Sequence, residues 1–199
     1  MRIYRIKDEY IEYLKKYDGK VANNKKEKRP YVGIVLEVNG FQYFAPLTSP
    51  KPKHEKMKNK LDFIKLSDGK LGAINLNNMI PVNSNVVINM DINKDCDIKY
   101  RELLKDQLEF INSNAKLIQG QANKLYIKVT EFNSFIKERC VNYKLLEEKA
   151  LLFNVEKEVA ITKTKNIKDI VSEAAKKAEK HNRKIENSIK IEKSFKDFG

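Results

Sequence analysis

Residues 31–49 read YVGIVLEVNGFQYFAPLTS, and this stretch decides the fold. Two runs of β-branched and aromatic residues flank the pair Asn39–Gly40. Both residues tolerate the positive φ angles of a two-residue hairpin turn, and this pair is the strongest short-range hairpin signal. The stretch therefore predicts two antiparallel strands joined by a tight turn.

The segments before the hairpin predict a strand, a helix and a loop. Residues 1–6 (MRIYRI) favour a short strand, whereas 8–18 (DEYIEYLKKYD) place apolar residues at helical spacing behind an acidic start. Residues 18–30 (DGKVANNKKEKRP) combine turn residues with clustered lysines and show no periodicity. This pattern is typical of an exposed basic loop.

The segment that follows the hairpin, residues 48–54, contains Pro50 and Pro52. Proline removes a backbone donor and restricts the residue before it, so we expect a rigid polar loop and neither a helix nor a central strand. Short strands are then predicted within 61–66, 70–75, 78–82 and 85–91. From Ile98 the apolar residues recur with the helical period, and this predicts helices within 100–118, 124–140 and 143–154.

Strands therefore precede helices, which indicates the α+β class. The regular spacing of the short strands suggests a compact antiparallel barrel. Residues 1–156 form the predicted globular domain. Residues 157–199 carry a thin apolar stripe on a highly charged background and nearly lack aromatic residues. They predict a basic C-terminal extension that is helical or partly disordered.

The charge points to a polyanionic partner. The 199 residues carry 40 Lys and Arg against 27 Asp and Glu, a net charge of +13. Residues 25–60 alone hold 9 basic and 3 acidic side chains interspersed with aromatic residues, a composition that favours nucleic acid. The lysines expected to contact phosphates are Lys25, Lys26, Lys28, Lys53, Lys56 and Lys58.

Other classes of protein and site find little support. The sequence has no run of 18 apolar residues and no secretory or transit segment at its N-terminus, so a cytoplasmic protein without a membrane partner is expected. Cys96 and Cys140 lie far apart, and no phosphate-binding glycine loop, HExxH motif or carboxylate cluster is present. We therefore expect neither a metal nor a cofactor.

Six polar side chains surround the hairpin: Arg29, Thr48, Ser49, Lys51, Lys53 and His54. Because the two strands are antiparallel, the start of the first and the end of the second lie at the same edge. Cations and hydroxyls suit an RNA transesterification, in which a 2′-hydroxyl attacks its own phosphate and the protein stabilises the oxyanions. The alternative is that Thr48 and Ser49 only satisfy turn backbone and that His54 is a surface residue.

The run RPYVGIVLEVNGFQYFAPLTSPKPKHEKMK, the later LGAINLNNMIPV and the opening MRIYRIKDEYIEYLKKYDGKV resemble the ToxN/AbiQ family. These proteins are the endoribonuclease toxins of type III toxin-antitoxin systems, and the resemblance covers about residues 1–155. It implies a compact barrel related to the Kid/MazF/CcdB toxins, with added helices. It also implies metal-independent cleavage that leaves a 2′,3′-cyclic phosphate and a 5′-hydroxyl.

The partners that the resemblance implies are RNAs. The substrate would be single-stranded RNA at adenine-rich sites. The inhibitor would be a small RNA of tandem repeats, each folded as a pseudoknot and bound in a protein-RNA hetero-oligomer, and the system would act in phage defence by abortive infection.

The motif match carries residue roles. It places Thr48, Ser49 and Lys51 in the active-site loop and His54 just after it. Arg29 stands where related toxins have a basic residue, often lysine. Tyr10 and Tyr31 match aromatic positions near the RNA groove, and each could equally belong to the core.

Two other functions remain open from the residues alone. A non-catalytic RNA-binding module would use the same loop only to hold phosphates, and it would tolerate Ser49→Ala. A DNA-binding regulator is not favoured, because no helix-turn-helix pattern is recognisable.

Overall fold

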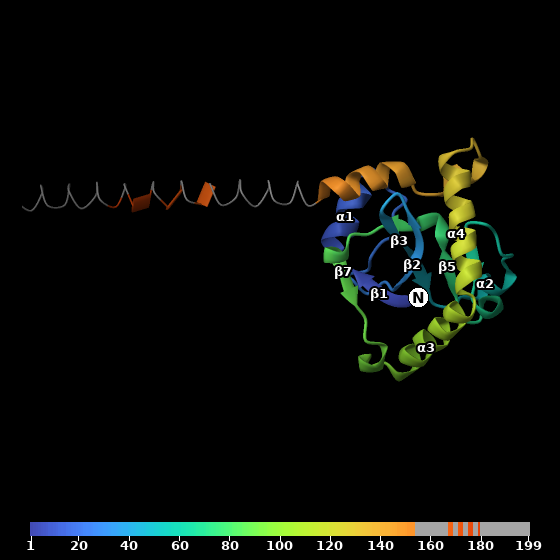
Figure 1. The fold of residues 1–199 in the computed structure, drawn as a ribbon. Coiled ribbons are helices and arrows are strands. Elements are labelled where there is room, and N and C mark those ends of the chain that lie inside the picture. Colours follow the sequence, from blue (N-terminus) through green and yellow to red (C-terminus); the bar gives the residue numbers. More distant parts are fainter. Residues whose placement is uncertain (154–166, 169–170, 173–174, 177–178, 180–199) are drawn as a thin grey trace, which may run out of the picture. The chain divides into compact units, whose positions relative to one another are not determined.

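The computed structural model describes residues 1–153 together with 167–168, 171–172, 175–176 and 179 (Figure 1). The chain divides into two units, Met1–Phe153 and Asn154–Gly199. The fold below is that of the first unit. The extension predicted over 157–199 lies almost entirely outside the described residues, so its helical or disordered state stays a prediction.

The centre of the first unit is an antiparallel sheet. Its strands are β1 (Arg2–Ile6), β2 (Tyr31–Val38), β3 (Phe41–Thr48), β4 (Phe63–Lys65), β5 (Ala73–Asn75), β6 (Ile80–Pro81) and β7 (Val87–Asn89). They follow the order β4-β5-β3-β2-β1-β7, with β6 also paired to β3. The α+β class is thus confirmed. Among the described strands, however, the edges β4 and β7 do not pair with each other, so the sheet is not closed.

The hairpin is confirmed at its turn, and the register of its strands shifts once, between Val32 and Leu36. Asn39 and Gly40 have φ angles of 52° and 78°, the double positive φ of a type I′ turn. Val38 pairs with Phe41 at one end of the hairpin, and Tyr31 pairs with Pro46 at the other. Strand β3 is the hub of the sheet, because β2 borders one side of it while β5 and β6 share the other.

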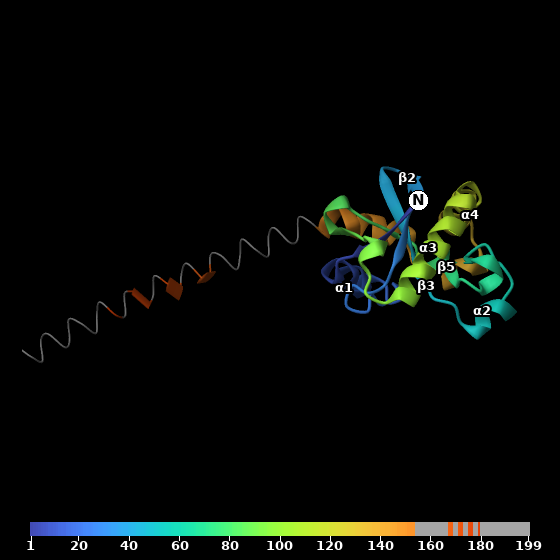
Figure 2. The same ribbon diagram turned by 90° about the horizontal axis from the view of Figure 1, so that it is seen from below.

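The helices surround this sheet. They are α1 (Asp8–Tyr17), α2 (Pro52–Lys56), α3 (Ile98–Ser113), α4 (Ala115–Thr130) and a last helix over 143–153. Figures 1 and 2 show α1 and α4 on opposite sides of the strands. Short 3-10 turns complete the unit: η1 (Ser67–Gly69), η2 (Leu76–Asn78), η3 (Ser84–Val86), η4 (Ile92–Lys94) and η5 (Phe135–Arg139). No helix in the described residues is long and apolar enough to cross a membrane.

Two helix predictions were wrong at their boundaries. The helix predicted over 100–118 is divided at Asn114, whose φ of -113° and ψ of 17° leave the helical region between α3 and α4. Asn114 donates its side-chain amide to the Phe110 carbonyl (2.8 Å), which stabilises the break. The helix predicted over 124–140 ends at Thr130, and the rest contains only the turn η5.

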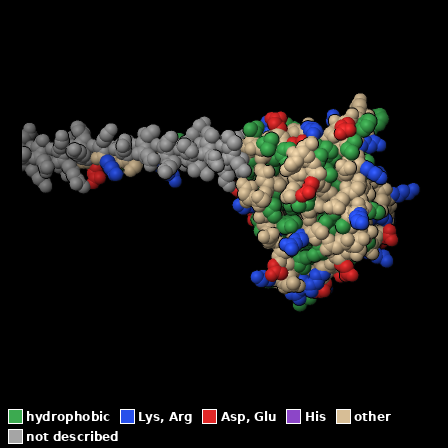
Figure 3. Space-filling model, viewed as in Figure 1, with side chains coloured by type: hydrophobic (Ala, Val, Ile, Leu, Met, Phe, Trp, Pro, Cys, Tyr) green, Lys and Arg blue, Asp and Glu red, His purple; other side chains and the backbone are tan. Residues whose placement is uncertain are grey.

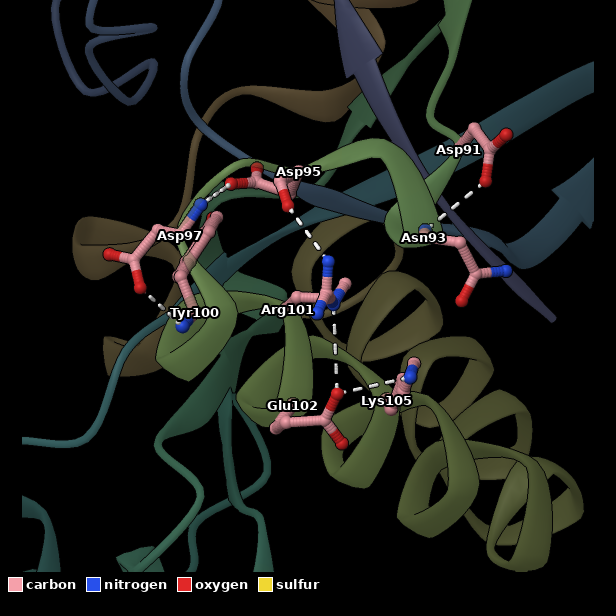
Figure 4. Close-up of polar contacts among 8 residues, drawn as sticks. All are labelled: Asp91, Asn93, Asp95, Asp97, Tyr100, Arg101, Glu102 and Lys105. Carbon is pink, nitrogen blue, oxygen red and sulfur yellow. Dashed lines mark hydrogen bonds and ion pairs between the residues drawn. The ribbon is translucent and has the colours of Figure 1, made fainter.

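The start of α3 is held by a polar network, shown in Figure 4. Asp97 caps the helix by accepting a hydrogen bond from the Tyr100 amide (3.0 Å). Arg101 reaches the Asp95 carbonyl (3.4 Å), and the Asp95 carboxylate forms an ion pair with Arg5 of β1 (3.8 Å). These contacts fix α3 against the sheet, and Tyr100 is thereby held in its first turn.

Candidate active site

The two ends of the hairpin meet at one edge of the sheet. The Leu47 amide donates a hydrogen bond to the Pro30 carbonyl (2.9 Å). Arg29 and Thr48 are the next residues on either side, so both lie beside this contact. The antiparallel geometry anticipated from the sequence is therefore present in the structure.

A cleft of about 710 Å³ opens at this edge. Its lining includes the five residues proposed as catalytic: Arg29, Thr48, Ser49, Lys51 and His54. The lining also gathers positive charge, with Asp62 as its single carboxylate. The cations are Lys25, Lys28, Arg29, Lys51, Lys53, Lys60 and Arg139. Figure 3 shows one face of the molecule, on which Lys and Arg side chains lie among acidic and hydrophobic ones.

The loop after the hairpin is partly helical. The predicted absence of helix over 48–54 was wrong, because α2 begins at Pro52 and contains Lys53 and His54. Proline is accepted at the first helical position, where its missing N–H would have no partner and its fixed φ already suits a helix. The His54 amide donates to the Lys51 carbonyl (2.8 Å) and closes the turn. Lys51 and His54 are thus held close together.

Two glycines let a second loop pack against this segment. Gly72 has φ 94°, and a Cβ atom there would lie 1.9 Å from the Thr48 carbonyl oxygen. Gly69 has φ 96°, and a Cβ atom there would lie 2.7 Å from the His54 carbonyl carbon. A side chain at either position would displace the backbone that carries the proposed catalytic residues.

Thr48 and Ser49 differ in how they are held. Thr48 is half-buried and donates its Oγ1 hydrogen to the Ala73 carbonyl (3.1 Å), so the lone pairs of Oγ1 remain available as acceptors. Ser49 is exposed at the start of the loop. An oriented acceptor and an exposed hydroxyl therefore stand side by side in the cleft.

His54 is buried, with 3% of its surface exposed, so the alternative of a surface histidine was wrong. Its ring lies 5.8 Å from that of Phe63, and its Nδ1 atom has no hydrogen-bond partner. Burial lowers the pKa of His54 below its ordinary 6.5, and the nearby charges of Lys53 and Lys51 lower it further. The imidazole is therefore neutral at pH 7, and its Nδ1 atom is buried without a hydrogen-bond partner.

The two tyrosines expected near the RNA groove lie in the core. Tyr10 has no exposed surface and donates its hydroxyl to the Pro81 carbonyl (2.7 Å). Tyr31 is 1% exposed, and burial raises the pKa of its hydroxyl well above the usual value. Neither ring can stack on RNA here, so their assignment to an RNA surface is corrected to a core role.

The predicted phosphate-binding lysines divide into two groups. Lys25, Lys28 and Lys53 line the cleft. Lys26, Lys56 and Lys58 are exposed, but they are not part of its lining. Their role in RNA binding stays a prediction.

The basic loop over 18–30 is anchored at its middle. Asn24 is buried and donates its amide to the Ile6 carbonyl (2.6 Å) and to Asp8 Oδ1 (2.7 Å). The Glu27 amide donates to the same Asp8 oxygen (3.0 Å), and Glu27 Oε1 accepts from the Asp8 amide (3.1 Å). The loop therefore presents Lys25 and Lys28 from a fixed backbone.

The structure adds residues that sequence reasoning missed. Tyr100 of α3 and Arg139 of η5 line the cleft, although they lie far from the hairpin in sequence. Arg139 forms an ion pair with the buried carboxylate of Asp62 (3.0 Å). Asn75, Asn77 and Asn78 also line the cleft. Their one sequence signal was the motif LGAINLNNMIPV, which contains all three.

Comparison with known proteins identifies similar chains. The family described as toxin ToxN of type III toxin-antitoxin systems matches residues 2–151. Endoribonuclease ToxN of Pectobacterium atrosepticum is 37% identical, over 79% of this chain and 96% of its own length. Endoribonuclease AbiQ of Lactococcus lactis is 31% identical, over 77% and 90% respectively.

Solved structures give the same result. One describes selective inhibition of a type III toxin by a non-coding RNA pseudoknot. It superposes with a TM-score of 0.69 and 34% identity, over 77% of this chain and 97% of the other. That of AbiQ, a lactococcal anti-phage endoribonuclease, has a TM-score of 0.69 and 29% identity, with the same coverage of both chains.

Proposed function

The chain belongs to the ToxN family of type III toxin-antitoxin systems, and we propose on this premise that it is an endoribonuclease toxin. It cleaves single-stranded RNA by metal-independent transesterification and leaves a 2′,3′-cyclic phosphate and a 5′-hydroxyl. The observation that supports this most is the gathering of the Thr48 and Ser49 hydroxyls, an imidazole and seven cations in one cleft.

The chemistry follows from these groups. The 2′-hydroxyl next to the scissile phosphate attacks phosphorus, loses its proton, and the bond to the 5′-oxygen breaks while that oxygen gains a proton. Negative charge grows on the phosphate oxygens, where preorganised donors such as the Lys51 ammonium and the Ser49 hydroxyl stabilise it. Thr48 Oγ1, with its hydrogen directed to Ala73, is oriented to accept a hydrogen bond from the attacking hydroxyl.

His54 suits the transfer of a proton. It is neutral at pH 7 and lines the cleft, so its imidazole can accept a proton but cannot act as the acid at that pH. We therefore assign to it the removal of the 2′-hydroxyl proton. We assign the neutralisation of the phosphate to Arg29, which lines the same cleft.

The inhibitor we propose is a small RNA of pseudoknot repeats. A folded RNA in the basic cleft would exclude the substrate and would assemble with the protein as a hetero-oligomer. Two relatives support this role, since one is inhibited by an RNA pseudoknot and another is an anti-phage endoribonuclease. We accordingly propose action on RNA in the cytoplasm, in abortive phage infection.

We also propose that the open sheet is a form of the Kid/MazF-type barrel. What supports this is that β3 pairs with β2 on one side and with both β5 and β6 on the other, so several short strands adjoin one long strand. The helices α3 and α4 and the last helix are then additions to this barrel.

The test uses purified protein freed of RNA and a short single-stranded substrate. We expect cleavage in EDTA, cyclic phosphate at the 3′ ends, and no cutting when the residue at the cleavage site is 2′-deoxy. Activity that vanishes on chelation and returns with magnesium would overturn the mechanism. A protein that binds this RNA and never cuts it would instead support the non-catalytic module.

A further inference from the structure

The side chain of Gln107, which does not line the cleft, forms hydrogen bonds with the backbone at the start of the active-site loop. Gln107 lies in the middle of α3 and is 1% exposed. Its Nε2 donates hydrogen bonds to the Leu71 carbonyl (2.5 Å) and to the Thr48 carbonyl (3.3 Å). It does not line the cleft, so it acts on the site only through the backbone.

We propose that Gln107 is a positioning residue for RNA cleavage, an inference that rests on the proposed function. Its hydrogen bond fixes the carbonyl of Thr48, whose carbon is bonded to the nitrogen of Ser49. Because the peptide unit is planar, the direction of this carbonyl also sets the direction in which Ser49 leaves the strand. Gln107 therefore determines where the Ser49 hydroxyl stands in the cleft.

Other contacts also fix Thr48, whereas the residues after it have few contacts. Thr48 is fixed at its hydroxyl by the Ala73 carbonyl, and Gly72 packs directly against its carbonyl oxygen. The four residues that follow, 49–52, are all exposed. The position of Ser49 thus depends on how firmly Thr48 is held.

The helix that carries Gln107 is anchored to the core and to the cleft. Tyr100 and Gln107 are seven residues apart and share one face of α3, together with the fully buried Leu104 and Ile111. Tyr100 lines the cleft at the first turn of this face. The same helix face therefore contacts the substrate cleft, the core and the active-site loop.

Gln107→Met tests the proposal, because methionine keeps the length of the side chain and removes its N–H donors. Single-turnover cleavage is expected to fall about 10–100-fold, the scale on which a small misplacement of reacting groups acts. RNA affinity should stay within about twofold, since no cleft cation changes. Loss of affinity with an unchanged cleavage step would overturn the assignment.

A matched control separates positioning from stability. Asn83 donates its side-chain amide to the Ala150 carbonyl (2.9 Å) and does not line the cleft. Asn83→Leu also removes an amide that holds a backbone carbonyl. It should lower the melting temperature, while cleavage stays within about twofold of the wild type.

Gln107→Glu provides a readout that a structural role alone would not move. A carboxylate cannot donate to either carbonyl, whereas a protonated carboxyl has one O–H that can donate to one of them, and burial raises the pKa of a carboxyl. The ratio of variant to wild-type cleavage should therefore rise as the pH falls, at a temperature where both proteins are fully folded. A ratio that does not vary with pH, or full activity of Gln107→Met, would overturn the proposal. A wild type that cuts no RNA would instead overturn the proposed function.

Discussion

Pro30 and Leu47 are joined across the hairpin by a backbone hydrogen bond of 2.9 Å. Arg29 and Thr48 therefore enter the cleft from one rigid edge, although 18 residues of hairpin lie between them. The three remaining catalytic candidates, Ser49, Lys51 and His54, all follow Thr48 within six residues. The site is thus built on the most firmly predicted element of the sequence.

Loss of Ser49 or Lys51 should remove catalysis rather than binding. Ser49→Ala and Lys51→Ala are each expected to slow cleavage by about 100-fold or more, the scale for loss of a transition-state donor. Single-turnover assays measure the rate, and filter binding should show that Ser49→Ala retains RNA. Lys70→Ala removes an exposed lysine outside the cleft and is the control. Equal effects of Lys51→Ala and Lys70→Ala would contradict the role of Lys51.

Lys25 and Lys26 form a matched pair for RNA binding. Both are exposed with φ angles of 57° and 56°, so alanine has the same backbone effect at each, but only Lys25 lines the cleft. Lys25→Ala should reduce the slope of log K against log salt by about 0.7, the value for one phosphate of a single strand. Lys26→Ala should leave the slope unchanged. A reduced slope for Lys26→Ala with an unchanged slope for Lys25→Ala would show that the RNA binds outside the cleft.

His54 should make stability depend on pH. Its pKa in the folded state is lowered below 6.5, so the unfolded chain takes up the proton first as the pH falls. The free energy of unfolding should therefore decrease as the pH falls from about 7.5 through 6.5 to the folded pKa, and His54 should add almost no slope above about pH 7.5. Urea denaturation across this range measures it. His54→Gln should remove this contribution and His181→Gln should retain it.

His54→Gln also tests whether His54 is the proton acceptor in cleavage. If His54 takes the 2′-hydroxyl proton, protonating it stops the reaction, so the cleavage rate should have an acidic limb that is absent from His54→Gln. A variant that keeps both the rate and the limb would reduce His54 to a packing role.

Arg139 should contribute both to RNA affinity and to the stability of the fold. Arg139→Ala removes a cleft cation and leaves the buried Asp62 without its ion pair, which should lower the free energy of unfolding by about 1–3 kcal/mol. Adding Asp62→Asn removes the unpaired charge and should restore most of this stability, but RNA affinity should stay low. Affinity that recovers with stability would show that Arg139 acts only through the fold.

The sequence predicted the elements that depend on local signals. Asn39–Gly40 predicts the hairpin because its backbone preference lies within the turn itself. Helix α2 was not predicted, because proline breaks a helix in its interior. Pro52 stands at the first helical position, where proline supports a helix. The break at Asn114 was missed as well, because apolar periodicity continues across it.

The candidate site was predictable only near the hairpin. The proposed catalytic residues within 48–54 are neighbours in the chain, so their chemistry could be inferred from one short segment of sequence. Tyr100 and Arg139 reach the cleft through the packing of α3 and η5, which no local pattern encodes. Tyr10 and Tyr31 were assigned to the RNA groove but lie in the core. The sequence around an aromatic residue in a basic region is the same whether its ring is buried or exposed.

The cleft lining extends from Ala22 to Arg139. During translation, a ribosome therefore releases the hairpin and its hydroxyls long before the last cation of the lining has been synthesised. An interrupted or truncated chain would carry the reactive residues without the geometry that makes them harmful. On the proposed function, RNA cleavage would therefore begin only after residue 139 has left the ribosome, when the whole cleft lining is present.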